Sequence, residues 1–391
     1  MRLLFIKESL AWPRSSGHDV HCFHLMKALA QLGHEISLAT AVEPTAEALA
    51  YLPLAHRFTL DSADWRLNGT DSLKLNYWQE RFRSYWGISA DRIRAAGQAA
   101  AECRADAVVV VGLNVLPYLG AVHNAQRVWY AADEWVWHHL SLVRWQEPNT
   151  WGHLRAAAIK GLYERVYASL WDRVWVVSAT DRRALRWVAD SNSIDVVPNG
   201  VDSDYFQPRA QPEIKRSCIF WGRLDFDPNV RALQWFCRSV WPALWRQAPD
   251  CQFKILGFQP GPSVRELASR DGISLIPDLP DIRPEIARSA LVVLPFQTTG
   301  GIKNKLLEAA SMGKAIVCTP QSCGGLRGLS EAPLAIARGV DSWVAKILDL
   351  WADAPRRHQL GFRARNWVLK HHTWTAAARQ ASESLSRLRF A

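Results

Sequence analysis

The residues of this chain that are best suited to chemistry lie in one stretch, Gly300 to Ala309, in which two glycines precede an apolar run with helical spacing. The N-terminus of a helix leaves backbone N–H groups unpaired and carries partial positive charge, so it binds anions. Lys303 and Lys305 would add full charges there. Lys305 and Glu308 share a helix face, which offers a cation for a phosphate and a carboxylate for a sugar hydroxyl. The alternative is a solvated Lys–Glu pair on an ordinary helix, because such pairs are common and weak.

Short apolar runs alternate with helical patterns along the whole chain, and these elements must position that stretch. In the first half, strands are predicted at Leu3–Ile6, Glu35–Ala39, Ala107–Val111, Val128–Ala131, Val174–Val177 and Ile194–Val197. In the second half, strands are predicted at Cys218–Trp221, Gln252–Leu256, Ser274–Ile276, Leu291–Pro295, Ala315–Cys318 and Leu334–Ala337. Helices are predicted at Val20–Leu32, His153–Leu170, Val230–Trp245, Lys303–Ser311 and Trp374–Leu388. Apolar strands that alternate with helices are typical of parallel sheets covered by helices, so the predicted class is α/β.

A length of 391 residues suits two domains better than one core. The best linker candidate is Phe206–Lys215, which is polar, contains two prolines and lacks a helical period. We therefore expect two doubly wound, Rossmann-like domains, residues 1–206 and 207–372. Ligands of such sheets bind at the carboxyl ends of the strands, so the cleft between the two domains is the expected site.

The composition argues against several classes of protein. Apolar residues make up 49% and charged residues 21%, as in globular proteins, and no apolar run is long enough to span a bilayer. Lys7 and Glu8 interrupt the apolar N-terminus, so no signal peptide is expected. The seven cysteines are scattered and include no C-x-x-C pair, which favours reduced thiols in the cytoplasm and argues against structural zinc. Neither G-x-G-x-x-G nor a P-loop motif occurs, which argues against dinucleotide redox chemistry and NTP hydrolysis.

The net charge of +10 favours anionic partners, and the chain contains 20 Trp residues. Nucleic acid is not expected as a partner, because the sequence has no basic tail, zinc finger or helix-turn-helix pattern. Basic charge and Trp side chains are compatible with peripheral attachment to a membrane, although no segment of the sequence decides it. The expected location is therefore the cytoplasm, and contact with the inner face of a membrane stays open.

Five segments follow one another in an order that can be compared with known families. They are Pro13–Asp19, Val177–Asp181, Val197–Phe206, Phe220–Leu224 and Gly300–Gly313. This arrangement resembles the family 4 glycosyltransferases (glycosyl transferases group 1) of the GT-B fold, over most of the chain. Its most specific parts are Asn199-Gly200-Val201-Asp202 and the helix from Lys305 to Gly313. The resemblance implies two domains that face each other across a cleft, with a last helix, within residues 373–391, that returns to the first domain.

The resemblance implies that the second domain binds a nucleotide-sugar donor. Arg223 would grip the donor diphosphate, because a guanidinium fork binds two oxygens at once. The alternative for Arg223 is an ion pair with Asp225 or Asp227. The family's second basic residue is missing shortly after Arg223. Lys303 or Lys305 would supply that charge, and Lys305 is the better candidate because it lies in the first turn of the helix.

Glu308 matches the second glutamate of the family's paired-glutamate motif, which holds the nucleotide ribose. A carboxylate can accept both hydroxyl hydrogens of a ribose diol. The first glutamate of the motif is replaced by Gly300, and backbone N–H groups of Gly300 and Gly301 would substitute for it. Ile302 and Leu306 complete the donor-binding segment that the resemblance implies.

On the acceptor side, Asp133 follows the strand Val128–Ala131 and is the candidate that orients or deprotonates the acceptor. The alternative is that Asp133 or Glu134 caps the following segment. Ser16 and Gly17 lie in a loop that would approach the acceptor or a phosphate, although Gly17 could be a plain turn glycine. Asp133, Arg223 and Lys305 form the candidate catalytic set.

Two neighbouring histidines, His138 and His139, could line the cleft, but lone histidines are more often surface or core residues. No set of residues has the spacing of metal ligands, so neither a metal nor another cofactor is expected.

The resemblance implies transfer of a hexosyl group from a nucleoside diphosphate sugar to an acceptor hydroxyl, with retention of the anomeric configuration. The acceptor would be a glycan, a lipid-linked sugar or a small molecule, and polysaccharide biosynthesis would be one setting. Two alternatives remain open. One is a GT-B epimerase that acts on a nucleotide sugar, and the other is a non-catalytic module that binds nucleotide sugars or glycans.

Overall fold

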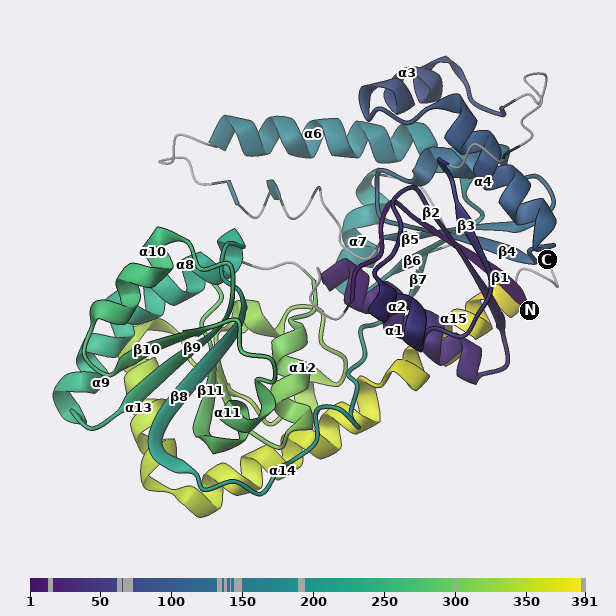
Figure 1. Ribbon diagram of the computed structural model, residues 1–391. Coiled ribbons are helices and arrows are strands. Elements are labelled where there is room, and N and C mark those ends of the chain that lie inside the picture. Colours follow the sequence, from purple (N-terminus) through teal and green to yellow (C-terminus); the bar gives the residue numbers. More distant parts are fainter. Residues whose placement is uncertain are drawn as a thin grey trace. The chain divides into compact units, whose positions relative to one another are not determined.

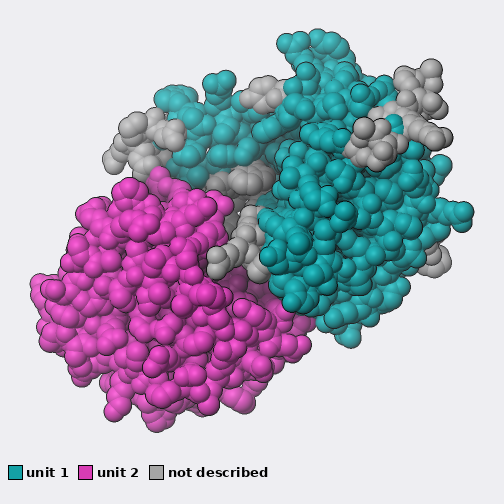
Figure 2. Space-filling model, in the orientation of Figure 1, with its two compact units in different colours: residues 1–199, 374–391 teal, residues 200–373 magenta. Residues whose placement is uncertain are grey.

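The computed structural model describes residues 1–12, 17–61, 65, 73–131, 136, 139–140, 142–143, 150–188, 194–298 and 301–387. The chain forms two compact units, which are coloured separately in Figure 2. Unit 1 consists of Met1–Asn199 together with Trp374–Ala391, and unit 2 consists of Gly200–Thr373. The sequence predicted a boundary at residue 206, whereas the contacts divide the chain between Asn199 and Gly200.

Unit 1 is built on a seven-stranded sheet in which every strand pairing is parallel, in the order β3-β2-β1-β4-β5-β6-β7 (Figure 1). Its strands are β1 Arg2–Lys7, β2 Glu35–Thr40, β3 Leu54–Thr59, β4 Ala107–Val111, β5 Gln126–Ala131, β6 Arg173–Val176 and β7 Ile194–Val196. Its helices are α1 Gly17–Gln31, α2 Ala46–Tyr51, α3 Tyr77–Tyr85, α4 Ala90–Glu102, α6 Thr150–Tyr167, α7 Ala179–Val188 and α15 Trp374–Arg387.

Unit 2 has a six-stranded sheet, again parallel throughout, in the order β10-β9-β8-β11-β12-β13. Its strands are β8 Ile214–Arg223, β9 Gln252–Phe258, β10 Ile273–Pro277, β11 Ser289–Leu294, β12 Ala315–Cys318 and β13 Ala335–Ile336. Its helices are α8 Asp227–Trp235, α9 Trp241–Gln247, α10 Pro262–Arg265, α11 Arg283–Arg288, α12 Asn304–Ser311, α13 Gly339–Ala352 and α14 Ala354–His371.

The central strands are buried on both faces because helices cover both sides of each sheet. All five residues of β4 are buried, as are all six of β11, so their side chains alternate between two apolar layers. In unit 1, α4 and α6 contribute to one layer, whereas α1 and α15 contribute to the other. The prediction of two doubly wound parallel-sheet domains is therefore confirmed.

The last helix, α15, packs against α1 in unit 1. Ala377, Ala381 and Leu385 are buried there, and the Trp374 ring stacks on His24 with 5.3 Å between the ring centroids. The chain therefore leaves unit 1 after Asn199 and returns to it at Trp374.

Two local predictions differ from the structure. The strand β3 was missed because it lies at the edge of the sheet and residues 55–57 are exposed, so it lacks an apolar run. The predicted helix Val230–Trp245 contains a π-helical turn, Phe236–Val240, between α8 and α9. Pro242 follows this turn and cannot donate a backbone hydrogen bond, which accounts for the wider turn before it.

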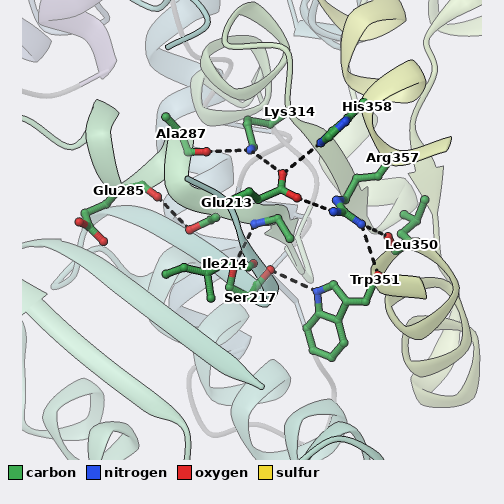
Figure 3. A network of polar contacts seen from close by, with 12 residues as sticks. Glu213, Ile214, Ser217, Glu285, Ala287, Lys314, Leu350, Trp351, Arg357 and His358 are labelled. Atoms are coloured by element: carbon green, nitrogen blue, oxygen red, sulfur yellow. Dashed lines mark hydrogen bonds and ion pairs between the residues drawn. The ribbon is translucent and has the colours of Figure 1, made fainter. Parts of the chain in front are cut away.

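A buried cluster of charged residues fixes the segment that precedes β8 (Figure 3). The Glu213 carboxylate pairs with the Arg357 guanidinium of α14 and lies 3.5 Å from the Lys314 ammonium, which follows α12. Lys314 also donates to the carbonyl of Ala287 at 3.1 Å, and Arg357 donates to that of Leu350 at 2.5 Å. The segment expected to be a linker is thus attached to the body of unit 2 where it meets β8.

Candidate functional site

The order of the strands in unit 2 reverses between β8 and β11, so the segments that follow these two strands run in opposite directions. In open parallel sheets, ligands bind outside the carboxyl ends of the strands at such a point. Here the strand β8 ends in Trp221, Gly222 and Arg223, and α12, which carries Lys305 and Glu308, follows β11. The residues that end β8 and those of α12, which come from the two sides of the switch point, therefore belong to one region of unit 2.

Lys305 lies against Gly222 and beneath two aromatic rings. A Cβ atom on Gly222 would lie only 2.4 Å from Cε of Lys305, so the ammonium stem occupies the space that a side chain would need. Its Nζ is 5.6 Å from the ring centroid of Phe220 and 5.8 Å from that of Phe296. Burial lowers the pKa of Lys305 to about 8, while nearby Glu308 acts in the opposite direction. This half-buried cation is not the solvated pair that was the alternative.

Gly222 is required here for its conformation as well as for its size. Its φ is +141°, a region that residues with a side chain rarely adopt. We expect Gly222→Ala to lower the free energy of unfolding by about 1–3 kcal/mol, because the strained backbone and the contact with Lys305 act together. Urea unfolding measures this, with Gly261→Ala as the control, since a Cβ on Gly261 meets nothing within 4 Å. Equal losses in the two variants would contradict the proposed packing.

A hydrogen bond from Trp221 of β8 holds the Glu308 side chain. The indole N–H of Trp221 donates a hydrogen bond of 2.7 Å to Oε2 of Glu308, across 87 residues of sequence. Burial raises the pKa of Glu308, whereas the Trp221 hydrogen bond and the Lys305 charge oppose that rise. A carboxylate has lone pairs for further donors, so Glu308 retains capacity for hydroxyl groups.

Arg223 ends β8 and forms the ion pair that the sequence analysis had considered. Its Nε lies 2.8 Å from Oδ1 of Asp225, and its guanidinium carbon lies 5.4 Å from the ring centroid of Phe226. The other candidate partner, Asp227, pairs instead with Arg231. The Arg223 side chain is 41% exposed and has five N–H donors, so an ion pair at Nε leaves donors for an anion.

The remaining residues of the donor segment have different structural roles. Gly301 has a φ of +55°, and Lys303 is the N-cap residue of α12, with its Nζ 5.2 Å from the Phe296 ring centroid. Ile302 and Leu306 are buried in the core of unit 2, so they anchor the segment rather than face a ligand. Gly300 lies outside the described residues.

Two hydroxyl groups donate hydrogen bonds to the backbone at and before Phe296. Thr319 donates a hydrogen bond of 2.7 Å to the carbonyl of Phe296, and Ser322 donates one of 2.6 Å to that of Leu294. Individual roles of Phe296, Phe220 and Trp221 were not predicted from the sequence. A glycine at the end of a strand, next to the basic candidate, was the signal that could have identified them.

Most acceptor-side candidates, namely Ser16, Asp133, Glu134 and His138, lie outside the described residues. Gly17 is the first residue of α1. His139 is described, and its Nε2 lies 2.9 Å from the ammonium of Lys160 on α6.

Unit 1 contains a buried ion pair that sequence reasoning missed, at the carboxyl end of β1. The Lys7 ammonium lies 2.7 Å from Oδ1 of Asp19 and donates to the carbonyl of Ser9 at the same distance. Both side chains are 10% exposed, so the pair joins β1 to the first turn of α1 in a largely dry environment. Among the described residues, no group of three or more His, Cys, Asp or Glu side chains could hold a metal ion.

Two family models match successive parts of the chain. The model described as Glycosyltransferase Family 4 matches residues 15–205, and the model described as Glycosyl transferases group 1 matches residues 215–353. Together the two models cover most of the chain, which is a glycosyltransferase of the GT-B fold. The resemblance stated from the motifs is therefore confirmed.

Solved structures show the same fold as this glycosyltransferase over nearly its whole length. Sucrose-phosphate synthase from Thermosynechococcus elongatus is 16% identical, with a TM-score of 0.70 over 100% of this chain and 99% of its own. TarM is 10% identical, with a TM-score of 0.72 over 98% of this chain and 99% of its own. Another TarM structure comes from S. aureus. Anabaena HepE in complex with UDP is 12% identical, with a TM-score of 0.67 over 99% and 100%. Among curated protein sequences, none matches this chain.

Proposed function

We propose that this glycosyltransferase moves a hexosyl group from a nucleoside diphosphate sugar to an acceptor hydroxyl, with retention and without a metal or other cofactor. The observation that carries the proposal is the half-buried Lys305 ammonium, which lies against Gly222 at the switch point of unit 2. A cation kept in this environment at a cost to stability has a functional explanation, because a diphosphate would compensate its lost hydration.

In the proposed reaction, the bond between the anomeric carbon and the diphosphate oxygen breaks, and the acceptor oxygen attacks from the same face. The acceptor proton passes either to an oxygen of the departing phosphate or to the carboxylate of Asp133. Negative charge grows on the diphosphate in the transition state, and Lys305, Arg223 and the N–H groups near Gly301 would stabilise it. Asp133 is proposed to orient or deprotonate the acceptor, with Ser16 and Gly17 in the adjacent loop.

The donor would lie along the carboxyl ends of the unit 2 strands. Glu308, held by Trp221, is proposed to accept the ribose hydroxyls. The N–H groups of Gly300 and Gly301 would take the place of the missing glutamate, beside Lys303. UDP is the first nucleotide to test, because the solved HepE and TarM structures include complexes with UDP.

The acceptor is proposed to be a glycan, a lipid-linked sugar or a small molecule, with polysaccharide biosynthesis as one setting in the cytoplasm. One TarM structure contains alpha-GlcNAc-glycerol, which makes glycosides a reasonable first class to test.

The decisive test incubates the protein with UDP-hexoses and a panel of glycoside acceptors, with and without EDTA. Transfer that survives EDTA, and a product whose anomeric configuration by NMR matches the donor, would support the proposal. Conversion of the donor without any acceptor would instead identify an epimerase. Tight binding without turnover of any donor would identify a non-catalytic module.

Glu308 and Arg223 should have separable effects on nucleotide binding. We expect Glu308→Ala to weaken binding of the free nucleoside by about 1–3 kcal/mol, because the ribose loses its acceptor. Arg223→Ala should leave nucleoside binding unchanged but weaken binding of the nucleoside diphosphate by a similar amount. Calorimetry with both ligands measures this. Unchanged nucleoside affinity in Glu308→Ala would remove Glu308 from the ribose site.

A further inference from the structure

The helix α6 has one exposed face that the proposed reaction does not use. Tyr163 and Tyr167 are fully buried in the core of unit 1 and fix the opposite face of the helix. Apart from Gly152, the exposed residues recur at intervals of three and four, so they form a single stripe on the helix. We call this set the α6 stripe: Trp151, Arg155, Ala158, Leu162 and Arg165.

The α6 stripe is apolar and basic at once. Trp151 is 76% exposed and Leu162 is 52% exposed, and an open groove beside them is lined by Leu140, Leu154 and Gly161, among others. Single exposed apolar residues are ordinary, but exposed apolar side chains that share a helix face with an apolar groove mark an interaction surface.

The charge on α6 is of one sign at the surface. The helix contains Arg155, Lys160 and Arg165, whereas its only carboxylate, Glu164, is 1% exposed. No ion pair of Arg155 or Arg165 occurs within the part of the chain that the structure describes. A partner of this face must therefore be apolar at its centre and anionic at its edges.

Contacts with α3 hold the last turns of α6, and the α6 stripe itself is exposed along the helix. In Figure 1 the first turns of α6 extend away from the strands, while α3 lies against the last turns. Gln79 of α3 donates a hydrogen bond of 2.8 Å to the carbonyl of Val166, and Tyr167 donates back to the carbonyl of Gln79 at 2.5 Å. Tyr77 and Trp78, at the start of α3, are 68% and 58% exposed.

We propose that the α6 stripe is a docking surface for an anionic lipid bilayer. Trp151 and Leu162 enter the boundary between headgroups and acyl chains, which favours Trp in particular. Arg155 and Arg165 extend their apolar stems along the helix and place their guanidinium groups among lipid phosphates. No helix of the described residues is long and apolar enough to cross a membrane, so the attachment is peripheral. This inference does not depend on the donor chemistry.

Vesicle flotation without nucleotide tests the proposal. The full-length protein should float with phosphatidylglycerol-containing vesicles at 0.1 M salt and not with pure phosphatidylcholine. Arg155→Gln and Arg165→Gln should each weaken binding about fivefold, because each basic residue near an anionic surface contributes about that factor. Trp151→Ser combined with Leu162→Ser should weaken it roughly tenfold or more.

The controls are Phe362→Ser, on a side chain that is 65% exposed on α14, and Arg363→Gln beside it. Binding that is equal on both lipid mixtures, or equally weakened by the controls, would overturn the proposal. A dimer in analytical ultracentrifugation that dissociates on Trp151→Ser with Leu162→Ser would instead identify a second copy of the chain as the occupant. Circular dichroism confirms that each variant is folded.

Discussion

Lys305→Met should abolish most of the affinity for a nucleoside diphosphate while leaving the affinity for the nucleoside unchanged. A hydrogen bond between an ammonium and a phosphate contributes about 1.5–3 kcal/mol, so the expected loss is roughly 10- to 150-fold. Met fills nearly the same volume along Gly222 and beneath Phe220 and Phe296, so the packing of the site should persist. Calorimetry with UDP and uridine measures the two affinities.

The same substitution should stabilise the ligand-free protein. Burial disfavours the charged form of Lys305, so removing the charge should raise the free energy of unfolding by roughly 1–2 kcal/mol at neutral pH. Lys346→Met, on a surface helix, is the control and should change neither quantity. Equal losses of UDP and uridine affinity in Lys305→Met would show that the ammonium does not contact the diphosphate.

The pH dependence of binding identifies the group independently. Because the pKa of Lys305 is about 8 rather than 10.5, its ammonium loses its proton as the pH rises through 8. The affinity for the diphosphate should be highest below pH 8 and decline above it. Between about pH 8 and 10, binding of the diphosphate should be accompanied by uptake of a proton. An ordinary lysine would show this decline only near its usual pKa. Lys305→Met should remove the decline, since the variant lacks the titrating ammonium.

Glu213→Ala should have the largest effect on stability. It removes the carboxylate that pairs with both Lys314 and Arg357 in Figure 3. The side chains of Lys314 and Arg357 are only 11% and 3% exposed, so their charges would remain buried without Glu213. Breaking such a buried pair costs about 3–5 kcal/mol, because the remaining charges are uncompensated. Burial lowers the pKa of Lys314 while Glu213 opposes this, so the ammonium should shed its proton more readily in the variant.

Thermal and urea unfolding measure this loss, which corresponds to roughly 10 °C in the melting temperature for a unit of this size. The matched control is Glu331→Ala, because the Glu331 carboxylate also pairs with Lys370 and His371 but is 56% exposed. That variant should be close to the parent protein in stability, because exposed ion pairs contribute little. Similar losses in the two variants would mean that burial does not decide the contribution of the Glu213 cluster.

The sequence predicted most strands of both sheets because their signal is local. Ala107–Val111 and Ala315–Cys318 are continuous apolar runs, and each forms a strand with the predicted bounds. The strand Leu54–Thr59 was missed because an edge strand with an exposed face has no such run. The α/β class thus followed from apolar periodicity, whereas this one edge strand did not.

The candidate site was predicted only in part, because its geometry depends on residues far apart in the sequence. Lys305 and Glu308 could be placed on one helix face from their spacing. Their partners could not, since Trp221 and Gly222 lie on a different strand and meet them only in the folded unit. The ion pair between Arg223 and Asp225 was accessible from sequence as an alternative, because the two residues are neighbours.

The return of α15 to unit 1 makes unit 2 an insertion within unit 1. A gene fragment for residues 1–199 would encode an incomplete fold, because Ala377, Ala381 and Leu385 would no longer cover the apolar side of α1. Such a fragment should aggregate when expressed alone. Residues 200–373, by contrast, are continuous and contain their own apolar core, so domain dissection of this enzyme should begin with that piece.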